Sequence, residues 1–140
     1  MTARLPRRLV LAGGGHAQVA VLRSLAMAPI AGSEITLINP QRETFYSGML
    51  PGVLAGLLDP EECTLDVAAL AARARIRFLE DAAVGLDTAE RQIELESGRT
   101  LPFDVLSIDI EMSIFVLRIL VFRFGIMSLL LKVSYNGNWM

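Results

Sequence analysis

Three consecutive glycines lie between a short apolar segment and a helix-forming segment. The apolar segment is residues 9–12, the glycines are Gly13, Gly14 and Gly15, and residues 17–27 are rich in Ala, Val and Leu. Glycine lets the backbone turn tightly and come close to an anion, and the unpaired N–H groups at a helix start point toward that anion. A strand, a glycine turn and a helix in this order predict a phosphate-binding turn.

The glycines match part of the dinucleotide-binding pattern G-x-G-x-x-G. The register is Gly13, Gly15 and then Gln18, so the third position, which lets helix and strand pack closely, is not glycine. On this pattern, Gly15→Val would block a nucleotide by bulk and leave the secondary structure nearly unchanged. His16, the only histidine, begins the helix. As a catalytic base it has no visible partner in the sequence, so we expect a solvent-facing or phosphate-neighbouring role.

A second strand is expected at residues 34–38, and it ends at Asn39. In dinucleotide folds the residue at this place, about 20 residues past the glycines, contacts the adenosine ribose and is usually acidic. Asparagine can accept one hydrogen bond and donate another, so the role is retained in weaker form. It also removes a charge that would repel a 2′-phosphate, so it does not choose between cofactors.

The remaining pattern favours an α/β fold. Residues 17–27 predict a largely buried helix, and Asp66 is the expected N-cap of a second helix. A third parallel strand is expected at residues 76–79. Short strand-like runs separated by turn residues then predict an antiparallel meander, before an apolar strand at residues 103–108 returns to the parallel sheet. The runs of the meander are residues 82–86, 92–95 and 100–101.

Three segments carry a resemblance to a known family: LAGGGHAQVAVLRSL from Leu11, YSGMLPG from Tyr46, and FDVLSIDI from Phe103. In this order they resemble the pyridine nucleotide-dependent flavoprotein oxidoreductases. The resemblance is closest to the NADH dehydrogenase-like flavoproteins, including the module fused to selenide, water dikinase. It covers roughly the first 110 residues, and implies a Rossmann-like FAD/NAD(P)-binding domain with a parallel sheet and a β-meander, here incomplete.

The resemblance implies FAD as the cofactor and NAD(P)H as the substrate of the full-length family. It implies that the three glycines lie at the pyrophosphate, that Asn39 lies at the ribose, and that the loop from Tyr46 to Pro51 lies beside the flavin ring. From the residues alone, a plain proline-glycine turn would look similar to that loop. The resemblance also puts Asp109 near the cofactor, with an exposed strand residue as the alternative. The candidate cofactor-binding residues are Gly13, Gly14, Gly15, His16, Ala17, Asn39, Tyr46, Pro51, Ala83, Val84 and Asp109, of which Ala83 and Val84 would contact adenine through main-chain groups.

Length and composition restrict the function further. A chain of 140 residues fits one domain. The family's second dinucleotide domain and its distal acidic element have no counterpart here, so we expect an oxidoreductase part that is inactive alone. The net charge of −2 gives no reason to expect nucleic acid as a partner. The single Cys63 excludes an internal disulfide and a C-x-x-C pair, so we expect a cytoplasmic location. No metal-ligand pattern is visible.

The last thirty residues differ in character from the rest. Glu111 stands where the family has glycine, and residues 112–131 form one apolar run about as long as a membrane span. We favour a non-native end, from a reading-frame change or truncation, which divides the chain into a partial cofactor domain at residues 1–110 and an anomalous tail at 111–140. A membrane segment containing Arg118 and Arg123, or an element filling the sheet edge, are the alternatives. Two other functions stay open: a non-catalytic nucleotide-binding module, and a small membrane-attached protein.

Overall fold

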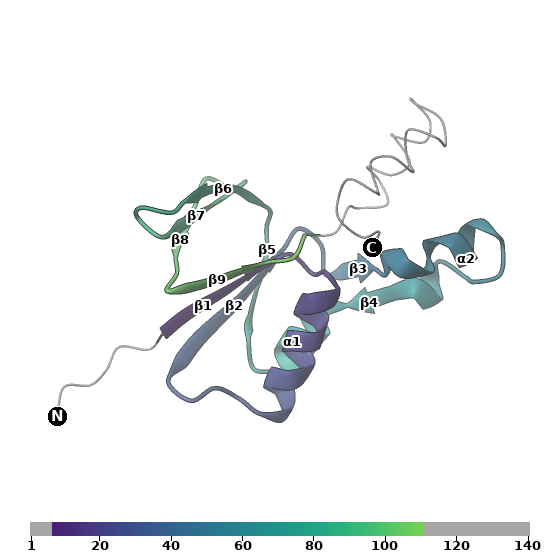
Figure 1. The fold of residues 1–140 in the computed structure, drawn as a ribbon, viewed down its shortest axis with the longest axis horizontal. Helices are drawn as coiled ribbons and strands as arrows, with labels where there is room; N and C mark the ends of the chain where they lie inside the picture. The colour runs from purple at the N-terminus through teal and green to yellow at the C-terminus, as the bar shows by residue number, and fades with distance from the viewer. Residues whose placement is uncertain (1–6, 111–140) are drawn as a thin grey trace.

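A parallel sheet of four strands forms the centre of the computed structural model, which describes residues 7–110. The strands are β1 (Arg7–Ala12), β2 (Ser33–Asn39), β5 (Arg77–Glu80) and β9 (Val105–Ile108). They lie in the order β5-β2-β1-β9, and every neighbouring pair is parallel (Figure 1). Their carboxyl ends therefore share one edge of the sheet, which is where ligands bind in open α/β sheets.

Two helices make the connections to β2 and β5. Helix α1 (His16–Met27) joins β1 to β2, and α3 (Val67–Arg73) leads into β5. The side chain of Asp66 accepts a hydrogen bond of 2.7 Å from the backbone N–H of Ala69, so the expected N-cap of α3 is confirmed. α1 is less covered than expected: only Gln18, Leu22 and Leu25 are buried, because one helix face alone packs on the sheet and α3.

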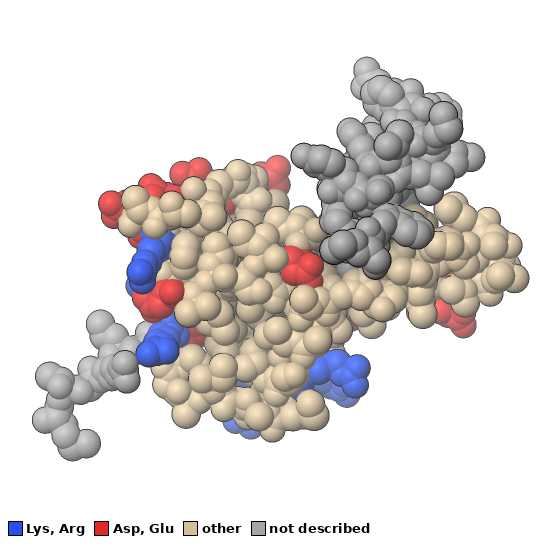
Figure 2. Space-filling view, in the orientation of Figure 1, with Lys and Arg blue, Asp and Glu red and all other residues tan. Residues whose placement is uncertain are grey.

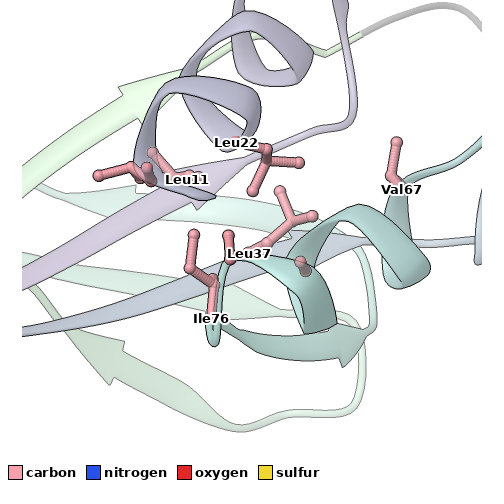
Figure 3. Packing of buried hydrophobic residues seen from close by; sticks show 8 residues of the cluster. Leu11, Leu22, Leu37, Val67 and Ile76 are labelled. Atoms are coloured by element: carbon pink, nitrogen blue, oxygen red, sulfur yellow. The ribbon is translucent and has the colours of Figure 1, made fainter. Parts of the chain in front are cut away.

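Side chains of β1 alternate between two hydrophobic clusters, which explains its continuous apolar run. Leu11 points toward α1 and α3, where it is buried with Leu22, Leu37, Val67 and Ile76 (Figure 3). On the opposite face, a second cluster is formed by Val10, Ala12, Ile38, Ile93 and Leu95. Truncating a core leucine such as Leu11 to alanine costs about 2–5 kcal/mol in comparable cores.

The second cluster is closed by an antiparallel meander, as the sequence predicts. Strands β6 (Ala83–Asp87), β7 (Gln92–Leu95) and β8 (Thr100–Pro102) form a separate three-stranded sheet in this order (Figure 1). Asp81, which lies just before β6, accepts hydrogen bonds from the hydroxyl of Ser97 and from the Ala82 N–H. The Ser97 hydrogen bond is the main reason why the pKa of Asp81 lies below its ordinary value.

An excursion between β2 and α3 projects from the sheet (Figure 1). Its two short strands, β3 (Glu43–Phe45) and β4 (Thr64–Asp66), pair antiparallel. Between them the chain forms the 3-10 turns η1 (Ser47–Met49) and η2 (Glu61–Cys63) and the short helix α2 (Leu50–Leu54), which has a proline in its first turn. Residues 47–58 carry no charge, and the surface around α2 is largely uncharged (Figure 2).

Within residues 7–110, no helix is both long enough and apolar enough to cross a membrane. In the same part of the chain, no three His, Cys, Asp or Glu residues are grouped so that they could hold a metal ion. The membrane, core-element and non-native-end interpretations of residues 111–140 lie outside the described residues. The division of the chain at residue 110 stays a prediction.

Candidate functional site

The glycine turn lies where β1 and β9 end side by side. Gly13 follows β1 directly, has a φ of +96°, and donates its N–H to the carbonyl of Ile38 at 2.8 Å. A Cβ atom at Gly13 would lie 2.7 Å from the carbonyl carbon of Asp109 and 2.8 Å from the Cα of Ile110. Both the positive φ and the approach of the β9 backbone therefore require glycine here.

Gly15 packs against the same residue of the β9 end. It is the N-cap of α1, with φ −70° and ψ −179°, and it donates its N–H to the Asp109 carbonyl at 3.1 Å. A Cβ atom here would lie 2.5 Å from both carboxylate oxygens of Asp109. A side chain at this position would thus displace part of the protein itself before it met a ligand, so Gly15→Val would test the packing of Asp109 as well as nucleotide binding.

Asp109 places a carboxylate at the N-terminus of α1. Its Oδ2 atom accepts hydrogen bonds from the N–H of Ala17 at 2.7 Å and of Gln18 at 3.2 Å, and its own N–H donates to Ala12 at 2.8 Å. The side chain is half-buried. The positive end of the helix dipole favours a negative group at this point. Two of the N–H groups at the helix start, where the sequence predicts a phosphate, thus bind an internal anion.

Asn39 lies against the middle glycine of the turn. A Cβ atom on Gly14 would lie 3.2 Å from both Cγ and Oδ1 of Asn39. The Nδ2 group of Asn39 donates to the backbone carbonyl of Gln41 at 2.7 Å, and the residue is only 7% exposed. Because a carbonyl can only accept, this bond determines the orientation of the amide. One of the two N–H donors of Asn39 is therefore in use, and Oδ1 and the second N–H are the groups left for a ligand.

The turn also meets the segment that follows β3. The rings of His16 and Tyr46 lie with their centroids 3.7 Å apart and their planes tilted by 48°. Tyr46 is anchored through its N–H, which donates to the carbonyl of Cys63 at 2.8 Å. Pro51 is exposed in the first turn of α2. The structure therefore brings His16 and Tyr46 together beside the glycines.

The adenine-side candidates, Ala83 and Val84, begin shortly after a residue that is hydrogen-bonded to Asn39. The N–H of Asp81 donates to the carbonyl of Asn39 at 3.1 Å, and β6 starts two residues later. Ala83 is half-buried, and Val84 is exposed where the register between β6 and β7 shifts. Both residues belong to the separate sheet of the meander, and the hydrogen bond from Asp81 connects the start of that sheet to the carboxyl end of β2.

One pair of contacting residues at the site was not predicted from the sequence. Gln18 is fully buried, and its Nε2 donates to the backbone carbonyl of Ser107 at 3.1 Å and to its hydroxyl at 3.0 Å. These bonds join α1 to β9 at the position where the dinucleotide pattern has its third glycine. The Oε1 atom of Gln18 is buried with no hydrogen-bond partner among the described residues. In the sequence, the signal for this pair was the polar Gln18 in a helix segment that is otherwise rich in Ala, Val and Leu.

Solved structures share this arrangement of strands, helices and meander. A sulfide:quinone oxidoreductase from Aquifex aeolicus matches 73% of this chain with a TM-score of 0.64 and 22% identity. A ferredoxin reductase from Rhodopseudomonas palustris matches 74% with a TM-score of 0.55 and 26% identity. A water-forming NADH oxidase from Lactobacillus brevis, bound to NADH, matches 73% with a TM-score of 0.57 and 19% identity. The fold is Rossmann-like.

The match extends over only part of those proteins. The chain covers 24% of the sulfide:quinone oxidoreductase, 26% of the ferredoxin reductase and 24% of the NADH oxidase, so it spans about a quarter of their length. No protein-family model and no curated protein matches the chain. The comparisons therefore support the expected α/β fold with its parallel sheet and meander, and they leave the residues of the site untested.

Proposed function

We propose that this chain binds FAD through the adenosine diphosphate half of the cofactor, as the FAD-binding part of an NAD(P)H-linked flavin oxidoreductase. One observation carries the proposal: the glycine turn at the carboxyl edge of the parallel sheet has Asn39, at the end of the adjacent strand, directly against Gly14. This is the relation between phosphate turn and ribose residue that dinucleotide binding requires.

The residues of the turn fit a pyrophosphate in part. The N–H of Gly14 donates no hydrogen bond to another described residue, and three successive glycines keep side chains away from the backbone. In contrast, the N–H groups of Ala17 and Gln18 bind the carboxylate of Asp109. We therefore assign the phosphates to the backbone of the glycine turn and not to the first turn of α1, and we assign the adenosine ribose to Oδ1 of Asn39.

The flavin end of the cofactor is assigned to the segment that begins at Tyr46. The contact between Tyr46 and His16 connects this segment to the phosphate turn, so one extended ligand can reach from Asn39 across the glycines to the tyrosine ring. Bound FAD would supply the electron-transfer chemistry. The residues of this chain would bind the cofactor and orient it. The main-chain groups of Ala83 and Val84 are proposed to lie at the adenine.

The solved structures support the oxidoreductase part of the proposal through the general class of enzyme to which they belong. The three are named as an oxidoreductase, a reductase and an oxidase, and the NADH oxidase was solved with NADH bound. Since this chain spans about a quarter of their length, the activity of a whole oxidoreductase is proposed for it only as part of such an assembly. The electron acceptor is not part of the proposal.

Binding measurements on the full chain test the proposal. We expect calorimetry to show one FAD per chain, and ADP-ribose to compete with FAD because it contains the same adenosine diphosphate group. Riboflavin and FMN lack the adenosine and serve as matched controls that should bind much more weakly. Equal affinity for FAD and FMN, or no competition by ADP-ribose, would contradict adenosine diphosphate recognition at the glycine turn.

A second measurement addresses catalysis by this chain alone. Hydride transfer needs the nicotinamide ring held against the flavin, and the described residues contain one glycine turn of this type. We therefore expect the FAD-saturated chain to oxidise NADH, with a quinone or dye as acceptor, at less than about 1 per second, below the usual enzyme range. Turnover within that range would show that the chain builds a nicotinamide site by itself.

A further inference from the structure

We propose that Asp109 makes the glycine turn select pyrophosphates that are esterified at both ends over nucleotides with a terminal phosphate. Under this proposal, the site binds dinucleotides, in which each phosphate is joined to one sugar by an ester and to the other phosphate by an anhydride, and discriminates against nucleotides that end in a free phosphate. The inference rests on the proposed function, because it concerns which phosphate ligands the same turn accepts. It assigns to Asp109 a role in specificity that its hydrogen bonds to α1 make possible.

The charge of Asp109 is held in place from several directions. Its Oδ2 accepts from Ala17 and Gln18, its carbonyl accepts from Gly15, and its N–H donates to Ala12. The carboxylate also lies so close to Gly15 that a single added methyl group would overlap it. The backbone of Asp109 is thus fixed between β1 and the turn, and swinging the carboxylate away would break two hydrogen bonds to the helix N-terminus. A phosphate arriving at the glycines meets a fixed negative charge.

No positively charged side chain faces Asp109 across the glycine turn among the residues described above as touching the glycines. On that side the turn is lined by Asn39, whose amide is bonded to the backbone of Gln41. The helix dipole and the two N–H groups attract the carboxylate itself, and they are consequently not available to a second anion. An incoming phosphate therefore meets the backbone N–H groups of the glycine turn and, beside them, the carboxylate of Asp109.

Ligand charge then decides affinity. Each phosphate of a pyrophosphate that is esterified at both ends carries one negative charge, whereas a terminal phosphate carries nearly two at neutral pH, since its second pKa is about 6. Repulsion by a half-buried carboxylate grows with the charge on the ligand and is screened by salt. ADP-ribose and ADP contain the same adenosine and the same two phosphates, and they differ in whether the outer phosphate is esterified. They are therefore the matched pair of probes.

The experiment measures the affinity of ADP-ribose and of ADP by calorimetry at low salt, for the full chain and for Asp109→Asn. Asparagine has nearly the same shape as aspartate, so its Oδ1 can still accept from the N–H groups of Ala17 and Gln18 while the charge is removed. We expect the parent to prefer ADP-ribose by about tenfold or more, and the variant to gain about tenfold in ADP affinity with less than about a threefold change for ADP-ribose. In the parent, added salt should reduce the preference.

Two further variants keep the test interpretable. Asp66→Asn removes the charge from the N-cap of α3, which accepts a hydrogen bond in the same way outside the glycine turn, and it should leave both affinities unchanged. Asp109→Ser provides a second neutral variant if Asp109→Asn does not fold, and it should reduce the preference for ADP-ribose over ADP in the same way.

The possible failures are distinct. If ADP-ribose binds but the ratio of the two affinities is the same in parent and neutral variants, the selection by Asp109 is refuted and the proposed function stands. The same conclusion follows if the neutral variants lose affinity for both ligands equally, since Asp109 would then only hold the turn in shape. If neither the parent nor any variant binds FAD or ADP-ribose, the proposed function fails and the inference fails with it.

Discussion

Arg8 and Asp104 are joined by four hydrogen bonds where β1 begins and the chain enters β9. The backbone N–H of Arg8 donates to Oδ2 of Asp104 at 2.7 Å, and the guanidinium donates to the carboxylate at 3.1 and 3.3 Å. In return, the N–H of Asp104 donates to the carbonyl of Arg8 at 2.8 Å. This pair holds the first residues of β9 against β1, and Asp109, the residue after β9, lies beside the glycine turn.

The first prediction follows from this pair. The hydrogen bonds from Arg8 lower the pKa of Asp104 from 3.8 to about 2. A carboxyl group whose pKa is lower in the folded than in the unfolded state stabilises the fold at any pH above its unfolded-state pKa. This contribution is lost as the pH falls through its folded-state pKa. We therefore expect Asp104→Asn to be less stable than the parent at pH 7, and the difference to shrink between about pH 4 and pH 2.

Urea unfolding at a series of pH values measures this effect. Glu90→Gln is a matched control, because Glu90 is an exposed carboxylate outside the contact between β1 and β9. It should keep the pH dependence of the parent. If Asp104→Asn retained that same dependence between pH 4 and pH 2, the ion pair with Arg8 would not contribute to folding.

The second prediction separates two reasons for glycine at position 13. Gly13 and Gly32 both have a positive φ, of +96° and +69°, but only Gly13 has backbone atoms of another strand against it. An alanine in the left-handed region costs about 1–2 kcal/mol by itself. Gly32→Ala should cost about that much, and Gly13→Ala at least about 2 kcal/mol more, because the end of β9 would have to move. Denaturant unfolding of both variants checks this, and equal costs would mean that β9 does not press on the turn.

The third prediction concerns Asn39. Asn39→Ala removes the Oδ1 acceptor and the bond to the Gln41 carbonyl, and a hydrogen bond is worth about 0.5–1.5 kcal/mol net. We expect a loss of about threefold to tenfold in the affinity of FAD and ADP-ribose, and no change for FMN. Gln41→Ala keeps its backbone carbonyl and should bind all three ligands like the parent. A loss of FMN affinity equal to that of FAD would show that Asn39 supports the fold and not the ribose.

The fourth prediction tests the flavin end of the proposed site. Tyr46 contacts His16 through its ring, so Tyr46→Phe keeps this contact and Tyr46→Ala removes it. Stacking of a flavin on an aromatic ring would make Tyr46→Ala weaken FAD binding severalfold, while ADP-ribose, which has no flavin, binds as before. Tyr46→Phe should stay close to the parent. If Tyr46→Ala weakened both ligands to the same degree, the segment after β3 would act on the phosphate turn and not on the flavin.

Local patterns account for the elements that were predicted correctly. The β1, glycine and α1 unit depends on a run of apolar residues, on glycine's freedom of rotation and on a helix-forming stretch, all within residues 9–27. The N-cap at Asp66 and the meander are local in the same way, since an N-cap bonds within one helical turn and turn residues act over a few positions. The pairing of β3 with β4 was missed because those strands are three residues each, too short for a periodic pattern.

The sequence by itself determined the α/β class, the position of the glycine turn and Asn39 at the end of the second strand. Only the tertiary structure decided what those groups contact. Asp109 bonds to Ala17 across 92 positions, and Gln18 bonds to Ser107 across 89. These contacts exist because β9 pairs with β1 in the folded sheet, and an order of strands follows from the packing of the whole chain. No local propensity encodes that an acidic residue after the last strand will reach the first turn of the first helix.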